Sequence, residues 1–406
     1  MMTNAKQPAT TANAIAGSER IDLLDGLRGF ALLGILIANL PVLFGWVFMP
    51  PEQMAQITSP QVAESYQALV TFFVDGKFYT IFSMLFGIGF TLQLDRLEHR
   101  GAQGVAVFRR RMLVLLAIGL THMCLIWSGD ILTLYAALGL LLPLFRKWSE
   151  RKLVITALVL LALPLALEPL RTAAGIDLGA PFEQLSGQID TLFLGAPIAD
   201  PVAAVRSTDW RWFFAWQLDG SPWRIAHLLH TWRIPKVLGV MLIGMVLGRR
   251  LMAGTLLNDR RLMWRTVVIG LAIGVPCNLY FALHPKVYQE HWSAVIGTAP
   301  MGFAYAALFT LAWPRAKAVL GQLAPVGRMA LTSYLTHSLI GVLLLGPFLG
   351  LATRVGPIGF TLLALPIYAA QIVFSRWWLA RHAQGPMEQL WRWGTYGSAA
   401  RATQPS

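Results

Sequence analysis

Long apolar blocks constrain the fold of this chain more than any other feature of its sequence. Hydrophobic residues make up 56% of the chain and charged residues only 13%, whereas a soluble protein needs about a quarter charged residues to cover its surface. Several blocks reach the roughly 20 residues with which a helix crosses a bilayer. A helix also satisfies its own backbone hydrogen bonds in hydrocarbon. The sequence therefore predicts an all-α, polytopic membrane helix bundle.

We expect about ten transmembrane helices in a single domain over 21–397, with boundaries accurate to a few residues. Residues 1–20 are polar and lack the apolar core of a signal peptide, so we expect a disordered cytoplasmic tail there and a flexible tail at 398–406. The predicted spans are 27–48, 78–94, 109–128, 131–146, 153–170, 235–250, 264–283, 293–313, 329–349 and 357–379.

The loops that join these blocks alternate between rich and poor in Lys and Arg. The loop at 95–111 carries five arginines, whereas 49–77 and 284–292 are acidic or nearly neutral. The other basic loops are 146–152, 249–265 and 314–328. Because cytoplasmic loops are enriched in Lys and Arg, this alternation predicts that both termini lie in the cytoplasm. The long segment 171–233 then lies outside, as a cap or a re-entrant structure.

The net charge of +13 is explained by this loop pattern, and we expect no nucleic-acid partner, which would need a clustered basic face. Small residues one helical turn apart, at 244–248 and 270–274, predict close packing of helices within the protein. The two cysteines lie in apolar blocks without a ligand-like spacing, so we expect them to pack in the bundle.

Ionisable groups at membrane depth are costly unless paired or hydrated, which makes them functional candidates. Asp25 and Arg28 begin the first span three residues apart, so they share a helix face and can form an ion pair. The residues fit two interpretations, a structural helix-terminus pair or part of a binding site at the cytoplasmic mouth.

A second polar group is predicted toward the outer side. Asn39 lies deep in the first span and Lys77 opens the second. His122 and Asp130 flank the tight outer turn of a helical hairpin, so a hydrogen bond between them is sterically feasible. A carboxylate that orients an imidazole is the usual way to make histidine a general base. The alternative is a buried histidine bonded to a backbone carbonyl.

A third group leads into the span at 235–250. Its two histidines, His227 and His230, are three residues apart and could share a helix face, as metal ligands do. However, no HExxH motif or carboxylate follows at a suitable spacing. We therefore expect no metal site, and instead a basic, aromatic-rich outer lip that binds an anion or a headgroup. This lip consists of Arg224, His227, His230 and Arg233. In the ninth span, Arg328 and Tyr334 belong to an unusually polar stretch, which we expect to face the bundle interior.

Five segments together resemble the YeiB-like family of bacterial inner-membrane proteins, whose conserved region is a domain of unknown function. The resemblance covers nearly the whole chain except the N-terminal tail and much of 171–233. It implies a multi-pass protein of the bacterial inner membrane and supplies no reaction. The segments are DGLRGFALLGILIAN at 25–39, KFYTIFSMLFG at 77–87, His122 through GDIL at 129–132, GRMALTSY at 327–334, and QGPMEQLWR at 384–392.

The Asp25-x-x-Arg28 start is also similar to that of the transmembrane acyltransferase superfamily, which includes the O-antigen acetylases and heparan-alpha-glucosaminide N-acetyltransferase. This resemblance implies transfer of an acyl group from a cytoplasmic donor, often acetyl-CoA, to an outer acceptor. The O-antigen type has a histidine where this chain has Asn39, as the heparan acetyltransferase does. The catalytic histidine of the O-antigen acetylases therefore has no counterpart at this position. His122 is our candidate for its role, chosen for its chemistry and not from the resemblance.

The leading hypothesis is an acyltransferase with acyl-CoA as co-substrate and no tightly bound cofactor. Asp25 and Arg28 would organise the donor entrance, Asn39 and Lys77 would line the path, and His122 with Asp130 would activate a glycan or lipid acceptor. A transporter or lipid-handling protein is the alternative, and a scaffold or sensor without chemistry is the third. The sequence contains no GxSxG elbow, phosphate loop or dinucleotide fingerprint, so soluble-enzyme chemistry has no support.

Overall fold

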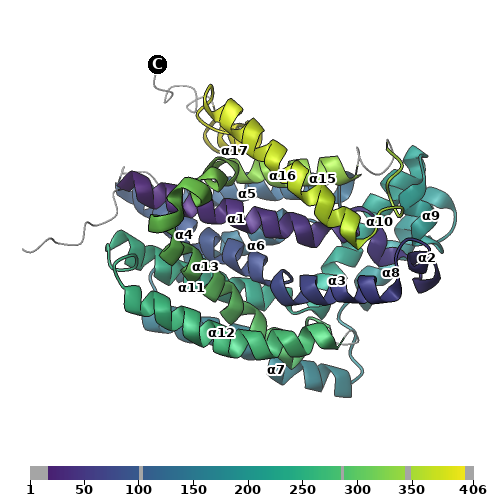
Figure 1. Ribbon diagram of the computed structural model, residues 1–406, viewed down its shortest axis with the longest axis horizontal. Coiled ribbons are helices and arrows are strands. Elements are labelled where there is room, and N and C mark those ends of the chain that lie inside the picture. The colour runs from purple at the N-terminus through teal and green to yellow at the C-terminus, as the bar shows by residue number, and fades with distance from the viewer. Residues whose placement is uncertain (1–16, 100–103, 285–287, 343–348, 398–406) are drawn as a thin grey trace, which may run out of the picture.

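The computed structural model describes residues 17–99, 104–284, 288–342 and 349–397, and these ranges contain helices and no β-strand. The prediction of an all-α fold is confirmed for this part of the chain. The helices, shown in Figure 1, are α1 Gly17–Leu43, α2 Pro51–Ala55, α3 Pro60–Phe73, α4 Lys77–His99, α5 Gly104–Leu125, α6 Leu132–Leu141, α7 Glu150–Ala173, α8 Ala180–Leu194, α9 Pro201–Arg206, α10 Trp210–His230, α11 Arg233–Met252, α12 Arg260–Leu283, α13 Trp292–Leu320, α14 Ala324–Arg328, α15 Ala330–Ser338, α16 Pro357–Leu379 and α17 Pro386–Tyr396.

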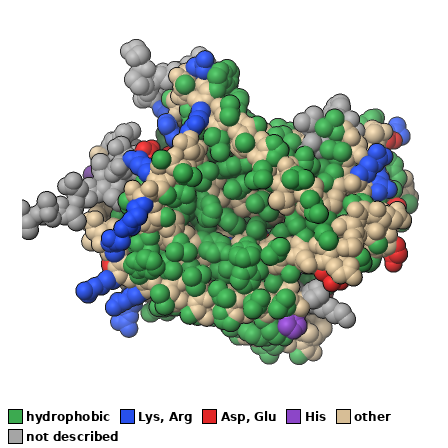
Figure 2. Space-filling view, in the orientation of Figure 1, with side chains coloured by type: hydrophobic (Ala, Val, Ile, Leu, Met, Phe, Trp, Pro, Cys, Tyr) green, Lys and Arg blue, Asp and Glu red, His purple; other side chains and the backbone are tan. Residues whose placement is uncertain are grey.

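The surface and the helix lengths fit a lipid bilayer. Figure 2 shows hydrophobic side chains over the middle of the molecule. Most Lys and Arg side chains on this face lie toward the end where α1 begins, and a smaller group lies at the other end. Among the described residues, six segments are long and apolar enough to cross a membrane, and Leu132–Phe145 is a shorter apolar helix. The six are Asp22–Leu43, Pro60–His99, Glu150–Ala173, Arg260–Leu283, Trp292–Arg328 and Pro357–Leu379. The count of ten spans and the cytoplasmic position of the termini stay predictions.

Two predicted segments differ from the structure or lie beyond it. The ninth span, predicted over 329–349, begins within one residue of its predicted start, because Met329 has a non-helical backbone (φ −106°, ψ 37°) and a new helix starts at Ala330. The helix that follows, α15, has only nine residues, and 343–348 lie outside the described ranges. The tails predicted at 1–20 and 398–406 also lie outside these ranges, except that α1 already begins at Gly17.

Glycine contacts fix α14 against α1 at one end of the molecule. A Cβ atom at Gly327 would lie 1.8 Å from the carbonyl oxygen of Asp25, and one at Gly29 would lie 2.2 Å from that of Leu323. Backbones approach this closely only where glycine leaves room. Arg328, the residue after Gly327, is thereby placed beside the first turns of α1. We call this the α17 end, because α17 also lies there (Figure 1).

Glycines also bring α4 and α11 together, as the small-residue spacing predicts. A Cβ at Gly87 would lie 2.1 Å from the carbonyl oxygen of Met241, and one at Gly244 would lie 2.2 Å from that of Met84. At the second motif, a Cβ at Gly270 would lie 2.5 Å from the carbonyl oxygen of Pro300 on α13. Both motifs therefore serve packing within the protein.

A break separates α3 from α4 within the segment Pro60–His99. Gly76 lies in this break with φ of +82°, a conformation that costs glycine little. Lys77 is fully buried, and its Nζ donates a hydrogen bond to the carbonyl oxygen of Thr71 at 2.6 Å. A cation suits the C-terminal end of a helix such as α3. The predicted loop at 49–77 is thus largely helical.

The segment 171–233 is folded as the helices α8, α9 and α10, which gather at the other end of the molecule (Figure 1). We call this the α8 end. The hydroxyl of Ser186 on α8 donates to the carbonyl oxygen of Asp219 on α10 at 2.8 Å. Near the other end of the same pair, His230 lies 2.7 Å from Asp177. These contacts hold α8 and α10 side by side and antiparallel. Residues of both helices line one end of a cavity.

Candidate functional site

One cavity of about 1040 Å³ is lined by residues from both ends of the molecule. Along α1 the cavity follows the chain from Arg28 to Val42, and along α4 it follows the chain from Tyr79 to Gln93. Each stretch rises roughly 21 Å at 1.5 Å per residue. The cavity walls between these points are apolar and include Leu32, Ile35, Phe82, Phe86, Phe90, Leu115 and Leu132. The cavity therefore joins the two predicted groups of polar residues through an apolar middle.

Three arginines line the cavity at the α17 end, namely Arg28, Arg111 and Arg328. The predicted ion pair between Arg28 and Asp25 is present, although Asp25 itself does not line the cavity. The guanidinium of Arg111 lies over the ring of Trp391 at 3.8 Å. Sequence reasoning placed Arg111 only in a basic loop, because nothing local shows that α5 carries it to the cavity.

Glu388 on α17 closes this end of the cavity and was not predicted as a site residue. Its Oε1 accepts hydrogen bonds from the amides of Leu331 at 2.7 Å and Thr332 at 3.2 Å, and its Oε2 accepts from the Thr332 hydroxyl at 2.6 Å. Burial raises the pKa of Glu388. The carboxylate thus caps the start of α15 from a distant helix, a pairing that no local pattern predicts.

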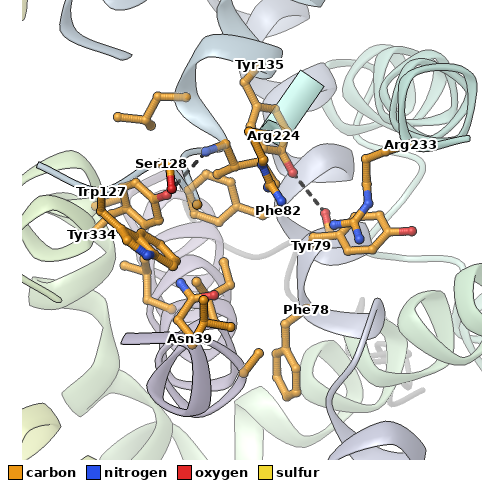
Figure 3. A pocket seen from close by; sticks show the side chains of 18 of the residues that line it. Asn39, Phe78, Tyr79, Phe82, Trp127, Ser128, Tyr135, Arg224, Arg233 and Tyr334 are labelled. Carbon is orange, nitrogen blue, oxygen red and sulfur yellow. Dashed lines mark hydrogen bonds between the residues drawn. The ribbon is translucent and has the colours of Figure 1, made fainter. Parts of the chain in front are cut away.

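Two arginines of the predicted lip, Arg224 and Arg233, line the cavity at the α8 end, and Figure 3 shows Arg233 beside Tyr79 and Arg224 beside Phe82. The Nε of Arg224 donates to the carbonyl oxygen of Asp130 at 3.0 Å. Arg233 lies 4.5 Å above the ring of Tyr79 and donates to the side-chain oxygen of Gln289. Within the described part of the chain, neither guanidinium forms an ion pair with a carboxylate.

The two histidines of the lip have different surroundings. His227 lines the cavity and stacks on Trp223 with ring centroids 5.5 Å apart, whereas His230 does not line it. Asp177, Glu183 and His230 place ligand atoms within 4.8 Å of one another, a spacing that a metal ion would accept. However, Asp177 already accepts from the His230 ring and from the Gly179 amide, and these bonds lower its pKa. This trio therefore serves the start of α8.

The predicted hydrogen bond between His122 and Asp130 is present, with Nδ1 and Oδ1 2.9 Å apart and both side chains buried. The second carboxylate oxygen accepts from the amide of Thr133 at 2.7 Å. His122 does not itself line the cavity. Its ring lies behind those of Trp127 and Tyr334, with centroids 6.3 and 5.4 Å away, and both of these line it (Figure 3). Its Nε2 has no hydrogen-bond partner among the described residues.

The remaining predicted residues divide between the cavity wall and the protein interior. Asn39, Arg328 and Tyr334 line the cavity. Lys77 does not, because its ammonium group is committed to the end of α3. The residues that sequence reasoning missed at the α8 end are Asp75, Tyr79, Asp190, Asp219 and Gln289. Tyr79 lies in the predicted span 78–94, whereas the other four come from predicted loops or from the segment 171–233. The sequence therefore shows no reason for these residues to meet.

Comparison with known proteins places the chain in a family. It is 31% identical to the uncharacterized protein YeiB of Escherichia coli strain K12 over 95% of this chain and 98% of that protein. The chain belongs to the YeiB-like family. It is also 29% identical to the uncharacterized protein YxaH of Bacillus subtilis strain 168, over 93% of this chain and 95% of YxaH.

An uncharacterized 39.9 kDa protein from the amylase 3' region of Bacillus acidopullulyticus is 31% identical over 94% of this chain and 95% of that protein. Residues 247–398 match the family described as a protein of unknown function, DUF418. No solved structure matches the chain. The predicted resemblance to the YeiB-like family is confirmed, and the more distant resemblance to acyltransferases stays a prediction.

Proposed function

We propose that the protein is a membrane acyltransferase of the bacterial inner membrane, in which acyl-CoA binds at the α17 end and the acceptor at the α8 end. The observation that carries this proposal is the single cavity with arginines at both ends and an apolar middle. We place the α17 end in the cytoplasm, because Lys and Arg gather there and basic loops mark the cytoplasmic side.

The α17 end suits the polyanionic part of an acyl-CoA. Guanidinium groups bind phosphates through paired, charge-assisted hydrogen bonds, and Arg28, Arg111 and Arg328 all line the cavity here. The apolar walls beyond them suit an acyl chain. The donor would thus lie with its phosphates at the cytoplasmic mouth and its thioester farther along the cavity.

His122 and Asp130 supply the general base in this proposal. Asp130 holds the Nδ1 side of the ring, so that Nε2 can take a proton from the hydroxyl or amine of the acceptor. The acceptor atom then bonds to the thioester carbonyl carbon, the C–S bond breaks, and CoA leaves as a thiolate that takes up the proton. Because Nε2 lies behind Trp127 and Tyr334, one of these side chains must move when the acceptor binds.

Purified protein incubated with radiolabelled acetyl-CoA or palmitoyl-CoA and a bacterial lipid extract tests this proposal. We expect a labelled lipid product whose formation depends on the protein. Both donors are needed because the cavity alone does not set the chain length. The absence of covalent product with either donor would count against acyl transfer.

Transport is the second candidate, and one observation favours it. Interrupted helices that line a binding site are common in transporters, and the break between α3 and α4 contributes Asp75 and Gly76 to the cavity wall. Counterflow of a radiolabelled solute in proteoliposomes, without modification of any acceptor, would support transport over acyl transfer.

A further inference from the structure

Three carboxylates line the cavity at the α8 end, those of Asp75, Asp190 and Asp219. Asp75 accepts a hydrogen bond from the Thr71 hydroxyl at 3.3 Å, and one of the other two has an unused oxygen. Asp190 on α8 is 4% exposed; its Oδ2 accepts from the Ile198 amide at 3.0 Å, and its Oδ1 has no hydrogen-bond partner within the described ranges. Asp219 on α10 also lines the cavity. Its burial, together with the charge of Asp190, raises the pKa of Asp219 to about 6. A cation between the two carboxylates would offset the cost of burying them.

The two arginines nearby are cationic groups that lack an anionic partner among the described residues. Arg233 is 8% exposed, lines the cavity, and its Nε has no hydrogen-bond partner in the part of the chain that the structure describes. The Nε of Arg224 donates a hydrogen bond to the neutral backbone carbonyl of Asp130. Buried guanidinium groups without a carboxylate partner favour an anionic ligand. The α8 end therefore contains unfilled positions for both a cation and an anion.

The helices place these positions in a definite order along the cavity. Asp219 and Arg224 are five residues apart on α10, a rise of about 7.5 Å, and Arg224 is the nearer of the two to α11, which begins with Arg233. Because α8 runs antiparallel to α10 and Ser186 contacts Asp219, Asp190 lies one turn farther from α11. Along α10 the carboxylates therefore lie farther from α11 than the guanidinium groups do, and Arg224 bonds to the carbonyl oxygen of Asp130, two residues before the apolar wall residue Leu132. The order is thus carboxylates, guanidinium groups and apolar wall.

That order is the order of groups in a zwitterionic aminophospholipid, whose ammonium, phosphate and acyl chains follow one another toward the bilayer core. We infer that the α8 end binds the headgroup of such a lipid, with its ammonium at Asp190 and Asp219 and its phosphate at Arg224 and Arg233. This inference goes beyond acyl transfer, since it names a ligand that would bind in the same way as an acceptor or as cargo.

Equilibrium binding of radiolabelled short-chain lipids to the detergent-purified full-length protein, without acyl-CoA, tests the inference. The lipids are phosphatidylethanolamine, its N-acetyl derivative, which lacks the positive charge, and phosphatidylglycerol. We expect phosphatidylethanolamine to bind at least about tenfold more tightly than the N-acetyl derivative. Equal affinity for the two would overturn the inference.

Variants test separately which residues bind the ammonium and which bind the phosphate of the headgroup. Asp219→Asn is expected to remove the preference for phosphatidylethanolamine and to leave phosphatidylglycerol binding unchanged, whereas Arg224→Gln should weaken binding of both lipids. Asp190→Asn repeats the first test, and Glu64→Gln is the control, because Glu64 on α3 is exposed and does not line the cavity. A retained preference in the folded Asp219→Asn and Asp190→Asn proteins would contradict the inference.

Free phosphoethanolamine distinguishes a lipid from a soluble ligand. We expect it to compete only weakly, because it lacks the chains that the apolar middle would hold. Binding of phosphoethanolamine with no binding of any lipid would overturn the assignment to a lipid. Since no acyl donor is present, a preserved lipid preference in a protein that transfers no acyl group would reject the acyltransferase proposal alone.

Discussion

At the scale of single residues, the arginines at the two ends of the cavity differ in the groups that they bond to. Arg28 is held by Asp25 and still faces the cavity, so it is oriented before any ligand arrives. Arg224 and Arg233 are held by neutral groups, a carbonyl and an amide oxygen. An oriented guanidinium loses less freedom when it binds phosphate, which favours the α17 end for a polyanionic donor.

Replacement of Arg28 by Gln tests this assignment. We expect the KM for acyl-CoA to rise about tenfold or more, since a charge-assisted contact to phosphate contributes on the order of 1.5–3 kcal/mol, with a smaller change in kcat. Steady-state kinetics with purified protein measures the two separately. Arg265→Gln is the control, because Arg265 is an exposed arginine near the start of α12 that does not line the cavity. A KM unchanged in the Arg28 variant would exclude Arg28 from donor binding.

His122→Gln tests the general base. We expect kcat for acyl transfer to fall about a hundred- to ten-thousand-fold, the usual contribution of such a base. Asp130→Asn should reduce kcat as well, because the ring would lose the charge that orients it. The exposed His284 supplies the control variant His284→Gln. Turnover that is unchanged by loss of His122 would leave the imidazole with a structural role only.

At the scale of helices, α17 is held to the bundle by a capping carboxylate. Glu388→Ala would leave the amides of Leu331 and Thr332 and the Thr332 hydroxyl without their acceptor. We expect a loss of about 1–3 kcal/mol of stability, seen as a lower Tm in detergent. Glu388→Gln should lose less, since its side-chain oxygen still accepts. An equal Tm for all three proteins would show that α17 is not held in this way.

The contact between α4 and α11 depends on the absence of a side chain at Gly244. Gly244→Val would drive its side chain into the backbone of Met84, and overpacking of this kind costs about 1–3 kcal/mol or more. Thermal unfolding measures the loss. Gly89→Val on α4 is the matched control, because a Cβ there meets nothing within 4 Å. Similar Tm values for the two variants would argue against close packing at this position.

The sequence predicts the local parts of this fold better than the long-range ones. Apolar blocks predict most of the long helices, and short spacings predict the pairs Asp25–Arg28 and His122–Asp130, because each pair lies within one helix or one turn. Asp190 and Asp219 lie on different helices, so only the packing of α8 against α10 reveals that they share a cavity.

At the scale of the whole molecule, the proposed transfer depends more on a cavity with charged groups near both ends than on any one residue in it. A site open at one end needs only one set of charged groups, whereas this cavity is lined by arginines near both ends. The Asp25–Arg28 pair, α14 and α17 organise one end, and α8 and α10 cover the other. The central claim is therefore that donor and acceptor reach one cavity from opposite sides of the membrane.

Proteoliposomes with protein of known orientation test that claim most directly. Radiolabelled acyl-CoA is supplied to one face at a time, with phosphatidylethanolamine among the lipids of the vesicle, and the covalent lipid product is measured. We expect product only when the donor is on the side of the α17 end. Product from either side equally, or uptake of solute with no covalent product from either side, would contradict it.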